Sequence, residues 1–260
     1  MTGASSGIGA ATCVLLRARG DRVFGTSRKP PPTAPLGGVE WVRMDVTDEG
    51  SVGAGVRAVL GRAGAIEGLV CAAGYGVFGS VEETSLARAR AQFETNVFGV
   101  INVLRAVLPG MRERGKGRVV VVGSLAGRAP IPFQAHYSAS KSAVDALCLA
   151  LRNELHGSGV LVSLVEPGDV RTDFNDRMDW GDSSASAYGE RIRRGEAVVR
   201  DSLPRAPGPE AVARAIVRAL DAARPRVRYT VGPDSRLVPL GRRLLPDAWS
   251  LALIRRHFHV

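Results

Sequence analysis

The segment Thr2-Gly3-Ala4-Ser5-Ser6-Gly7-Ile8-Gly9 runs into residues 8–19, where apolar side chains recur at helical spacing. Its three glycines permit a tight turn and let a phosphate group approach the backbone closely. The N–H groups and the dipole of the following helix would then face that phosphate. A glycine triplet is weak evidence by itself, because an ordinary loop can have the same composition.

Strand-like and helical segments alternate along the rest of the chain. Short strands are predicted at 22–26, 39–42, 68–72, 119–122, 160–165 and 227–231, and helices at 51–62, 86–113, 135–156 and 210–222. The run 119–122 is valine throughout, which is typical of a strand buried on both faces. This order predicts one α/β domain with a doubly wound, Rossmann-type parallel sheet in three layers. Ligands of such sheets bind at the carboxyl ends of the strands.

A phosphate-binding turn of this kind should follow a strand, yet only Met1 precedes Thr2. The expected strand would be central in the sheet, between the strands at 22–26 and 68–72. We therefore expect the first central strand to be missing, which would place the natural start of the protein upstream of Met1.

The composition is that of a soluble globular protein, with 260 residues, 45% apolar and 23% charged. No apolar run reaches the roughly 18 residues of a membrane-spanning helix, and no signal peptide is visible, so we expect a cytoplasmic protein. Cys13, Cys71 and Cys148 are far apart in apolar stretches. They are interpreted as buried free thiols, with no disulfide framework and no metal site.

The net charge is +10, and eight arginines against two aspartates lie in residues 222–260. A solvated basic face explains this excess better than nucleic-acid binding, because aromatic residues that would stack on bases are not interleaved with the cations. The segment Pro30–Pro35 is predicted to be a stiff surface loop.

Three side chains suggest acid–base chemistry. Tyr137 and Lys141 are four residues apart on a predicted helix and therefore share one face. Ser124 follows the valine strand, at the edge where ligands bind. A nearby ammonium group lowers the pKa of a tyrosine from about 10, which would allow Tyr137 to exchange protons near neutral pH.

Taken together, these segments resemble the short-chain dehydrogenase/reductase family. The matching residues follow in order and spacing over nearly the whole chain: Thr2–Gly9, Cys71–Gly74, Asn96, Ser124, Tyr137–Lys141 and Pro167–Thr172. The resemblance implies an enzyme that transfers hydride between a nicotinamide and a carbonyl or alcohol carbon. Where the family usually has two asparagines, this chain has Cys71 and Ala72, so their role in bracing the strand does not carry over.

The resemblance also implies a role for each catalytic residue. Tyr137 exchanges the proton, Ser124 holds and polarises the substrate oxygen, and Lys141 contacts the nicotinamide ribose. Asn96 holds a water molecule that connects Lys141 to solvent, although a helix-kink or capping role is the alternative for this residue.

The cofactor-binding residues implied by the resemblance are Gly3, Ser5, Ser6, Gly7, Ile8, Gly9, Arg28, Asp45, Val46, Ala73, Gly74, Tyr137, Lys141, Pro167, Gly168, Val170 and Thr172. Thr172 could equally be a helix N-cap. The strand at 22–26 leads to Ser27, where an acid that binds the ribose hydroxyls of NAD would stand, and Arg28 and Lys29 follow. Arginine suits a 2′-phosphate, so NADP(H) is expected over NAD(H), unless both cations are plain loop charges.

The substrate loop is expected at about 173–205. It contains Phe174, Met178, Trp180 and Tyr188, and Tyr75, Phe78, Ile131 and Phe133 lie near other strand ends. These side chains would form an apolar pocket if they point inward, and plain loop packing is the alternative. The stretch 73–79 and the long basic tail resemble the hydroxysteroid and retinol dehydrogenases, which implies an apolar lipid-, steroid- or retinoid-like substrate.

The amphipathic tail at about 233–260 could cover the pocket, pack on a partner subunit or lie on an anionic membrane, and we favour packing. Two other function classes stay open: a non-catalytic dinucleotide-binding regulatory protein, and a peripheral membrane binder. Relatives commonly form dimers or tetramers through the helices at 86–113 and 135–156, so a homodimer or homotetramer is expected.

Overall fold

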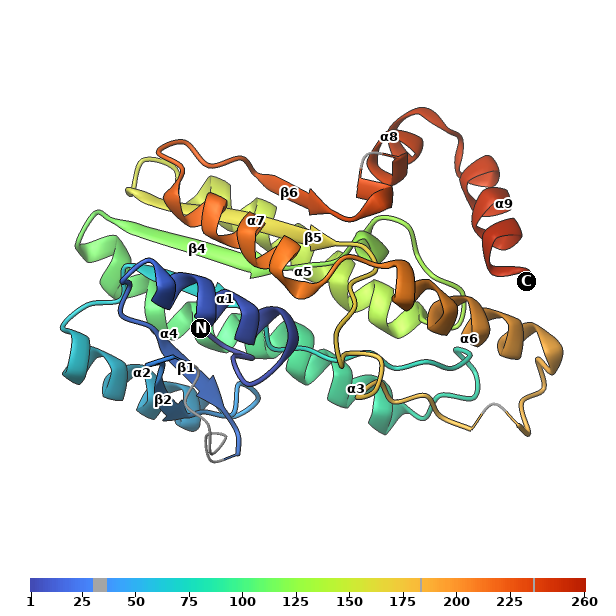
Figure 1. Cartoon of the computed structure of the whole chain (residues 1–260), viewed down its shortest axis with the longest axis horizontal. Helices are drawn as coiled ribbons and strands as arrows, with labels where there is room; N and C mark the ends of the chain where they lie inside the picture. Colours follow the sequence, from blue (N-terminus) through green and yellow to red (C-terminus); the bar gives the residue numbers. More distant parts are fainter. Residues whose placement is uncertain (30–36, 183, 236) are drawn as a thin grey trace.

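The computed structural model describes residues 1–29, 37–182, 184–235 and 237–260, so the predicted loop Pro30–Pro35 lies outside the described residues. The described elements are α1 (Gly7–Ala18), β1 (Phe24–Ser27), β2 (Glu40–Arg43), α2 (Glu49–Ala63), β3 (Gly68–Cys71), α3 (Leu86–Phe93), α4 (Gly99–Glu113), β4 (Gly117–Val122), α5 (Ala135–Glu154), β5 (Val160–Pro167), α6 (Glu190–Ser202), α7 (Pro209–Asp221), β6 (Arg228–Val231), α8 (Leu237–Leu244) and α9 (Asp247–Phe258), as Figure 1 shows.

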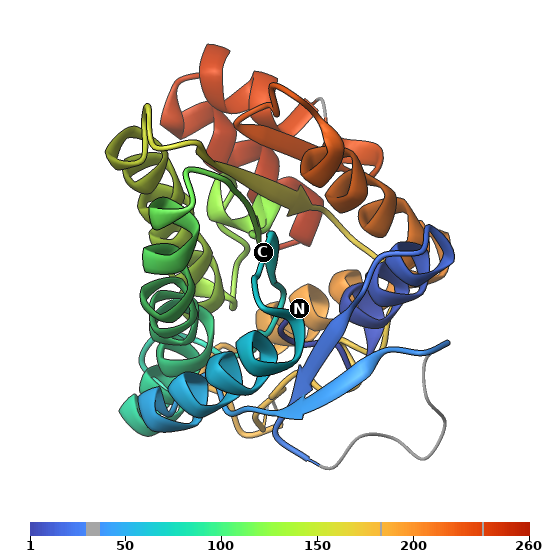
Figure 2. The same cartoon turned by 90° about the vertical axis from the view of Figure 1, so that its left-hand side faces the viewer.

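The strands are parallel and helices cover both faces, which confirms the predicted doubly wound architecture. One face of the sheet packs on α2, α4 and α5, and the opposite face packs on α1 and α7 (Figure 2). The side chains of β4 alternate between these layers, because Val119 and Val121 join the first core and Val120 joins the second. The valine run is therefore buried on both faces, as predicted.

The strands of the described residues fall into two sheets, β1-β2 and β3-β4-β5-β6. Met1 and Thr2 lie between them, where the first central strand was expected. The amide of Thr26 on β1 donates to the Met1 carbonyl at 2.9 Å, and the amide of Thr2 donates to the Val70 carbonyl on β3 at 2.9 Å. This two-residue segment thus connects the sheets and delivers the chain into the glycine-rich turn.

The bounds of most elements lie within two residues of the predicted ones. The predicted helix over 86–113 is helical throughout, and a π-helical turn, Glu94–Phe98, separates α3 from α4 within it. Such turns insert an extra residue per turn and often mark functional sites. The predicted substrate loop is also not plain loop, since it contains α6. Among the described residues, no helix is both long and apolar enough to cross a bilayer.

Candidate active site

A cleft of about 1800 Å³ runs along the carboxyl ends of the strands. Pockets for one small ligand measure about 300–1,000 Å³, so this cleft has room for two ligands side by side. Every predicted site residue except Asn96 lines it. The predicted residues therefore come together in one cleft, although the segments that carry them are far apart in the chain.

The glycine-rich turn adopts a backbone that requires glycine. Gly3 has a φ of +63°, and a Cβ added there would lie 2.7 Å from the carbonyl oxygen of Ala72. A Cβ added at Gly9 would lie 2.0 Å from the carbonyl oxygen of Gly3. Ser6 is the N-cap of α1 and makes no side-chain capping bond. The first N–H groups of α1 are thus available to an anion at the cleft, which fits the pyrophosphate of a dinucleotide.

The part of the cleft next to the end of β1 is basic. Ser27, Arg28 and Lys29 line it where β1 ends, opposite Asp45 and Val46. Burial raises the pKa of the Asp45 carboxyl, but hydrogen bonds from Thr47 and the nearby Arg28 outweigh burial and hold the pKa below its usual value. Two cations, Arg28 and Lys29, follow β1 where a carboxylate could have stood. Cations at this position suit a phosphorylated ribose.

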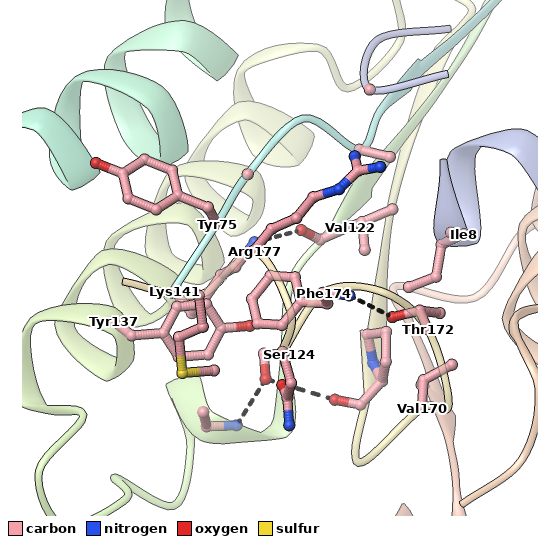
Figure 3. Close-up of a pocket in the computed structure, with 18 of the residues that line it drawn as sticks. Ile8, Tyr75, Val122, Ser124, Tyr137, Lys141, Val170, Thr172, Phe174 and Arg177 are labelled. Carbon is pink, nitrogen blue, oxygen red and sulfur yellow. Dashed lines mark hydrogen bonds between the residues drawn. The ribbon is translucent and has the colours of Figure 1, made fainter. Parts of the chain in front are cut away.

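The three predicted catalytic side chains, Ser124, Tyr137 and Lys141, lie close together in the cleft (Figure 3). Ser124 caps a 3₁₀ turn, Leu125–Gly127, and its Oγ accepts a hydrogen bond from the amide of Ala126 at 3.1 Å. Lys141 Nζ lies 5.8 Å from the centre of the Tyr137 ring and donates to the carbonyl oxygen of Val122 at 3.0 Å. Val122 could not be predicted from its residue type, because it participates through its backbone carbonyl.

Burial is the largest cause of the pKa shifts of Tyr137 and Lys141, which both lie on α5. It raises the pKa of the Tyr137 phenol to about 12, against a hydrogen bond with Ser124 that lowers it. It lowers the pKa of the Lys141 ammonium to about 8. The expectation that Lys141 pulls the Tyr137 pKa below its usual value is therefore wrong for this geometry. Tyr137 is a neutral phenol at neutral pH, whereas Lys141 is still mostly protonated.

Asn96 lies in the π-helical turn, behind the cleft wall. Its Nδ2 donates to the carbonyl oxygen of Tyr75 at 3.0 Å and to Ser140 Oγ at 3.1 Å, and its Oδ1 accepts from the Tyr75 amide at 3.1 Å. The amide thus braces the loop after β3 against α5. Its place in the π-helical turn is compatible with the alternative of a helix-kink residue, and the water molecule between Lys141 and solvent stays a prediction.

The loop after β5 closes onto the glycine-rich turn. A Cβ at Gly7 would lie 3.4 Å from Thr172, and Thr172 Oγ1 accepts a hydrogen bond from the Phe174 amide at 3.2 Å. Thr172 therefore lines the cleft and caps its own loop as well. Sequence reasoning missed Arg177, which reaches back to donate to Ser6 Oγ at 2.6 Å.

The eight large apolar and aromatic residues assigned to the substrate pocket divide into two groups. Four of the predicted residues line the cleft: Tyr75, Ile131, Phe174 and Met178. The other four, Phe78, Phe133, Trp180 and Tyr188, pack on one another beneath the loop instead, with the rings of Phe78 and Trp180 5.2 Å apart. For that second group the alternative of plain loop packing holds, because large rings bury more surface in a shared cluster than on an open cleft wall.

The C-terminal helices complete the wall opposite the glycine-rich turn. Five residues of α8 and α9 line the cleft: Val238, Leu253, Ile254, His257 and Phe258. The tail therefore covers the site, which is one of the three alternatives left open. Its packing is incomplete, since Leu237, Leu240, Leu244 and Trp249 remain more than half exposed.

Comparison with known proteins supplies the family. The family described as short chain dehydrogenase matches residues 1–181. The chain belongs to this family. A 3-ketodihydrosphingosine reductase of Bacteroides thetaiotaomicron is 34% identical over 95% of this chain and 92% of its own length. The estradiol 17-beta-dehydrogenase 1 of Rattus norvegicus is 34% identical over 95% of this chain and 76% of its own.

Solved short-chain dehydrogenases have the same fold. One from Streptomyces avermitilis superposes with a TM-score of 0.83, at 33% identity, over 97% of this chain and 93% of that one. A serine dehydrogenase solved with NADP+ has a TM-score of 0.77, at 26% identity, over 90% and 94% of the two chains. A Burkholderia phymatum member solved with NAD has a TM-score of 0.80, at 25% identity, over 97% and 93%. This short-chain dehydrogenase is therefore an oxidoreductase, and its solved relatives include one complex with NADP+ and one with NAD.

Proposed function

We propose that this short-chain dehydrogenase is an NADP(H)-dependent carbonyl reductase or alcohol dehydrogenase whose substrate is apolar and lipid-, steroid- or retinoid-like. The observation that carries the proposal is the position of Ser124, Tyr137 and Lys141. The same cleft has an apolar wall, to which Phe174, Met178, Leu203, Leu253, Ile254 and Phe258 contribute, and the Phe174 ring centre lies 5.8 Å from that of Tyr137. A carbonyl placed at Tyr137 would therefore carry its apolar body into that wall.

The nicotinamide supplies the hydride when it is bound. Tyr137 then acts on the oxygen, because a phenol with a pKa of about 12 keeps its proton at neutral pH and can donate it as negative charge develops there. Ser124 Oγ forms a hydrogen bond with Tyr137 and accepts one from the Ala126 amide. The bond that it donates to the Pro167 carbonyl is long, 3.5 Å, so its hydroxyl can turn to the substrate oxygen.

The preference for NADP(H) rests on the basic end of the cleft. Arg28 and Lys29 line the position that follows β1, and no carboxylate occupies the end of that strand. A guanidinium can form two parallel hydrogen bonds with a 2′-phosphate, whereas the hydroxyls of NAD would call for an acid.

We propose further that the enzyme works in the cytoplasm as a homodimer or homotetramer, with α3, α4 and α5 at the interface. Leu86 on α3 and Phe98 beside α4 are large apolar side chains that are 69% and 48% exposed, as an interface would explain. Sedimentation velocity on the purified chain tests this state, and a monomer at micromolar concentration would refute it.

A substrate screen that follows NADPH absorbance tests the function. Long-chain ketones and aldehydes, 3-keto lipids, steroids and retinal should be reduced, and short polar ketones should react poorly. Tyr137→Phe is the matched control, because it keeps the ring and removes only the hydroxyl. Cofactor binding without turnover on any carbonyl or alcohol would favour the non-catalytic, dinucleotide-binding alternative.

A further inference from the structure

A buried ionic cluster lies directly behind Ser124. Glu166 is next to Pro167 at the end of β5, and its side chain is 1% exposed. Arg128, at the end of the turn that Ser124 caps, donates from Nε to Glu166 Oε1 at 2.7 Å and from Nη2 to Oε2 at 2.9 Å. This is a two-bond fork, the geometry in which a guanidinium holds a carboxylate in one orientation.

The cluster has a second half. Arg228 on β6 donates to Glu166 Oε1 at 2.9 Å and also pairs with both oxygens of Asp145 on α5. Two guanidinium groups thus meet two carboxylates, so the buried charge is balanced. A buried ionic cluster adds little net stability compared with apolar packing, but a fully paired one fixes the elements that carry it in one arrangement.

The elements that the fork fixes are those that hold Ser124. On one side, Ser142 Oγ of α5 donates to the carbonyl of Gly127 at 2.6 Å, which attaches the turn to the helix of Tyr137 and Lys141. On the other side, the fork attaches the same turn to β5, whose Pro167 carbonyl faces Ser124 Oγ. Arg128 and Glu166 do not belong to the residues that line the cleft, so neither can touch a substrate there.

We propose that Arg128 and Glu166 are positioning residues that keep Ser124 Oγ within hydrogen-bond distance of the Tyr137 hydroxyl. The Gly123 amide, just before the turn, donates to the Val165 carbonyl of β5 at 2.8 Å, and the fork is the side-chain attachment of the turn's other end to that strand. Without the fork that end is released from β5, and Ser124 can move away from the phenol. A displacement of about 1 Å in a catalytic group can cost on the order of a hundredfold in rate. The proposal rests on the function proposed above only through the role of Ser124.

The first test needs neither cofactor nor substrate. Tyrosine labelled with ¹³C at Cζ gives an NMR signal that reports hydrogen bonding at the hydroxyl, and Tyr137→Phe assigns the signal of Tyr137. We expect Glu166→Gln to move this signal in the same direction as Ser124→Ala does. The matched control is Asp145→Asn, which removes a carboxylate from the same cluster and leaves the Arg128–Glu166 fork intact, so the signal should stay in place. A signal unmoved by Glu166→Gln, or moved equally by Asp145→Asn, would overturn the proposal.

The second test uses turnover once a substrate is found. Glu166→Gln and Arg128→Lys should each lower kcat by at least about tenfold, with the NADPH dissociation constant within twofold of the parent. In a Ser124→Ala background, Glu166→Gln should cause no further loss, since a residue that acts through Ser124 has no effect without it. Independent, multiplying losses would show a general structural role and overturn the proposal. If Glu166→Gln does not fold, Arg128→Lys carries both tests, because it keeps the buried charge and breaks only the fork.

If the screen finds no turnover, the proposed function fails but the NMR test still decides this inference.

Discussion

Arg177 Nη1 lies 2.6 Å from Ser6 Oγ, although the two residues are 171 positions apart in the sequence. The contact connects the loop after β5 to the N-terminus of α1, and a second bond at 2.6 Å pairs Arg177 with Asp173. The cation is therefore held beside the helix end that faces an anion.

Arg177→Ala should weaken NADPH and NADH binding by the same factor, roughly three- to tenfold, because the pyrophosphate is common to both. Fluorescence titration with each cofactor measures the two dissociation constants. Arg177→Lys is the control, since it keeps the charge and should recover part of the affinity. A loss confined to NADPH would place Arg177 at the 2′-phosphate instead.

Arg28→Ala, unlike Arg177→Ala, should weaken the binding of one cofactor only. It removes a guanidinium from the basic end of the cleft, so NADPH binding should fall by about ten- to a hundredfold while NADH binding changes little. The same titrations provide the measurement, and Arg43→Ala, an exposed arginine on β2, controls for lost charge alone. Equal losses for both cofactors would mean that Arg28 does not bind the phosphate.

Tyr137→Phe removes the proton donor and keeps the ring. We expect kcat to fall by at least about a hundredfold, the scale of general acid catalysis, with cofactor affinity close to that of the parent. Steady-state rates with the best substrate of the screen, alongside NADPH titration, measure both quantities. Turnover close to the parent's would exclude Tyr137 as the acid.

Lys141→Met should inactivate the enzyme and stabilise the fold. Burial lowers the Lys141 pKa from 10.5 to about 8, so the folded protein binds this proton less readily than the unfolded chain does. The resulting penalty on folding is complete below about pH 8, shrinks between pH 8 and 10.5, and is absent above.

The melting temperature of Lys141→Met should therefore exceed the parent's by a few degrees at pH 7, and the difference should narrow as the pH rises toward 10.5. Loss of the donor to the Val122 carbonyl opposes this gain by about 1 kcal/mol. Thermal melts at a series of pH values test the prediction. A variant that is less stable than the parent at every pH would contradict it.

Deletion of residues 237–260 removes five residues from the cleft wall, all of them on α8 and α9. We expect KM for the apolar substrate to rise while the NADPH dissociation constant is unchanged, because the glycine-rich turn lies at the other side of the cleft. Vesicle sedimentation with neutral and anionic lipids addresses the exposed leucines and arginines of the tail. Unchanged kinetics together with lost binding to anionic vesicles would favour the membrane-surface alternative.

Features that depend on local spacing could be predicted from the residues alone. Tyr137 and Lys141 share a helix face because they are four residues apart, and Gly3 and Gly9 mark a turn that only glycine can form. The alternation of strands and helices was sufficient for the fold, because a parallel sheet requires a crossover between its strands. Ser124 was predicted because it lies just after the valine run, at the sheet edge where ligands bind, and matches the family pattern.

The tertiary structure decided everything that depends on what surrounds a side chain. Burial, rather than the neighbouring Lys141, governs the Tyr137 pKa, and burial cannot be read from a four-residue spacing. The amide of Asn96 is used by Tyr75 and Ser140, which only the folded chain brings together. The Arg128–Glu166 fork joins residues 38 positions apart, and neither belongs to a recognisable motif. Such contacts arise when separate strands meet in one sheet, so local sequence patterns do not contain them.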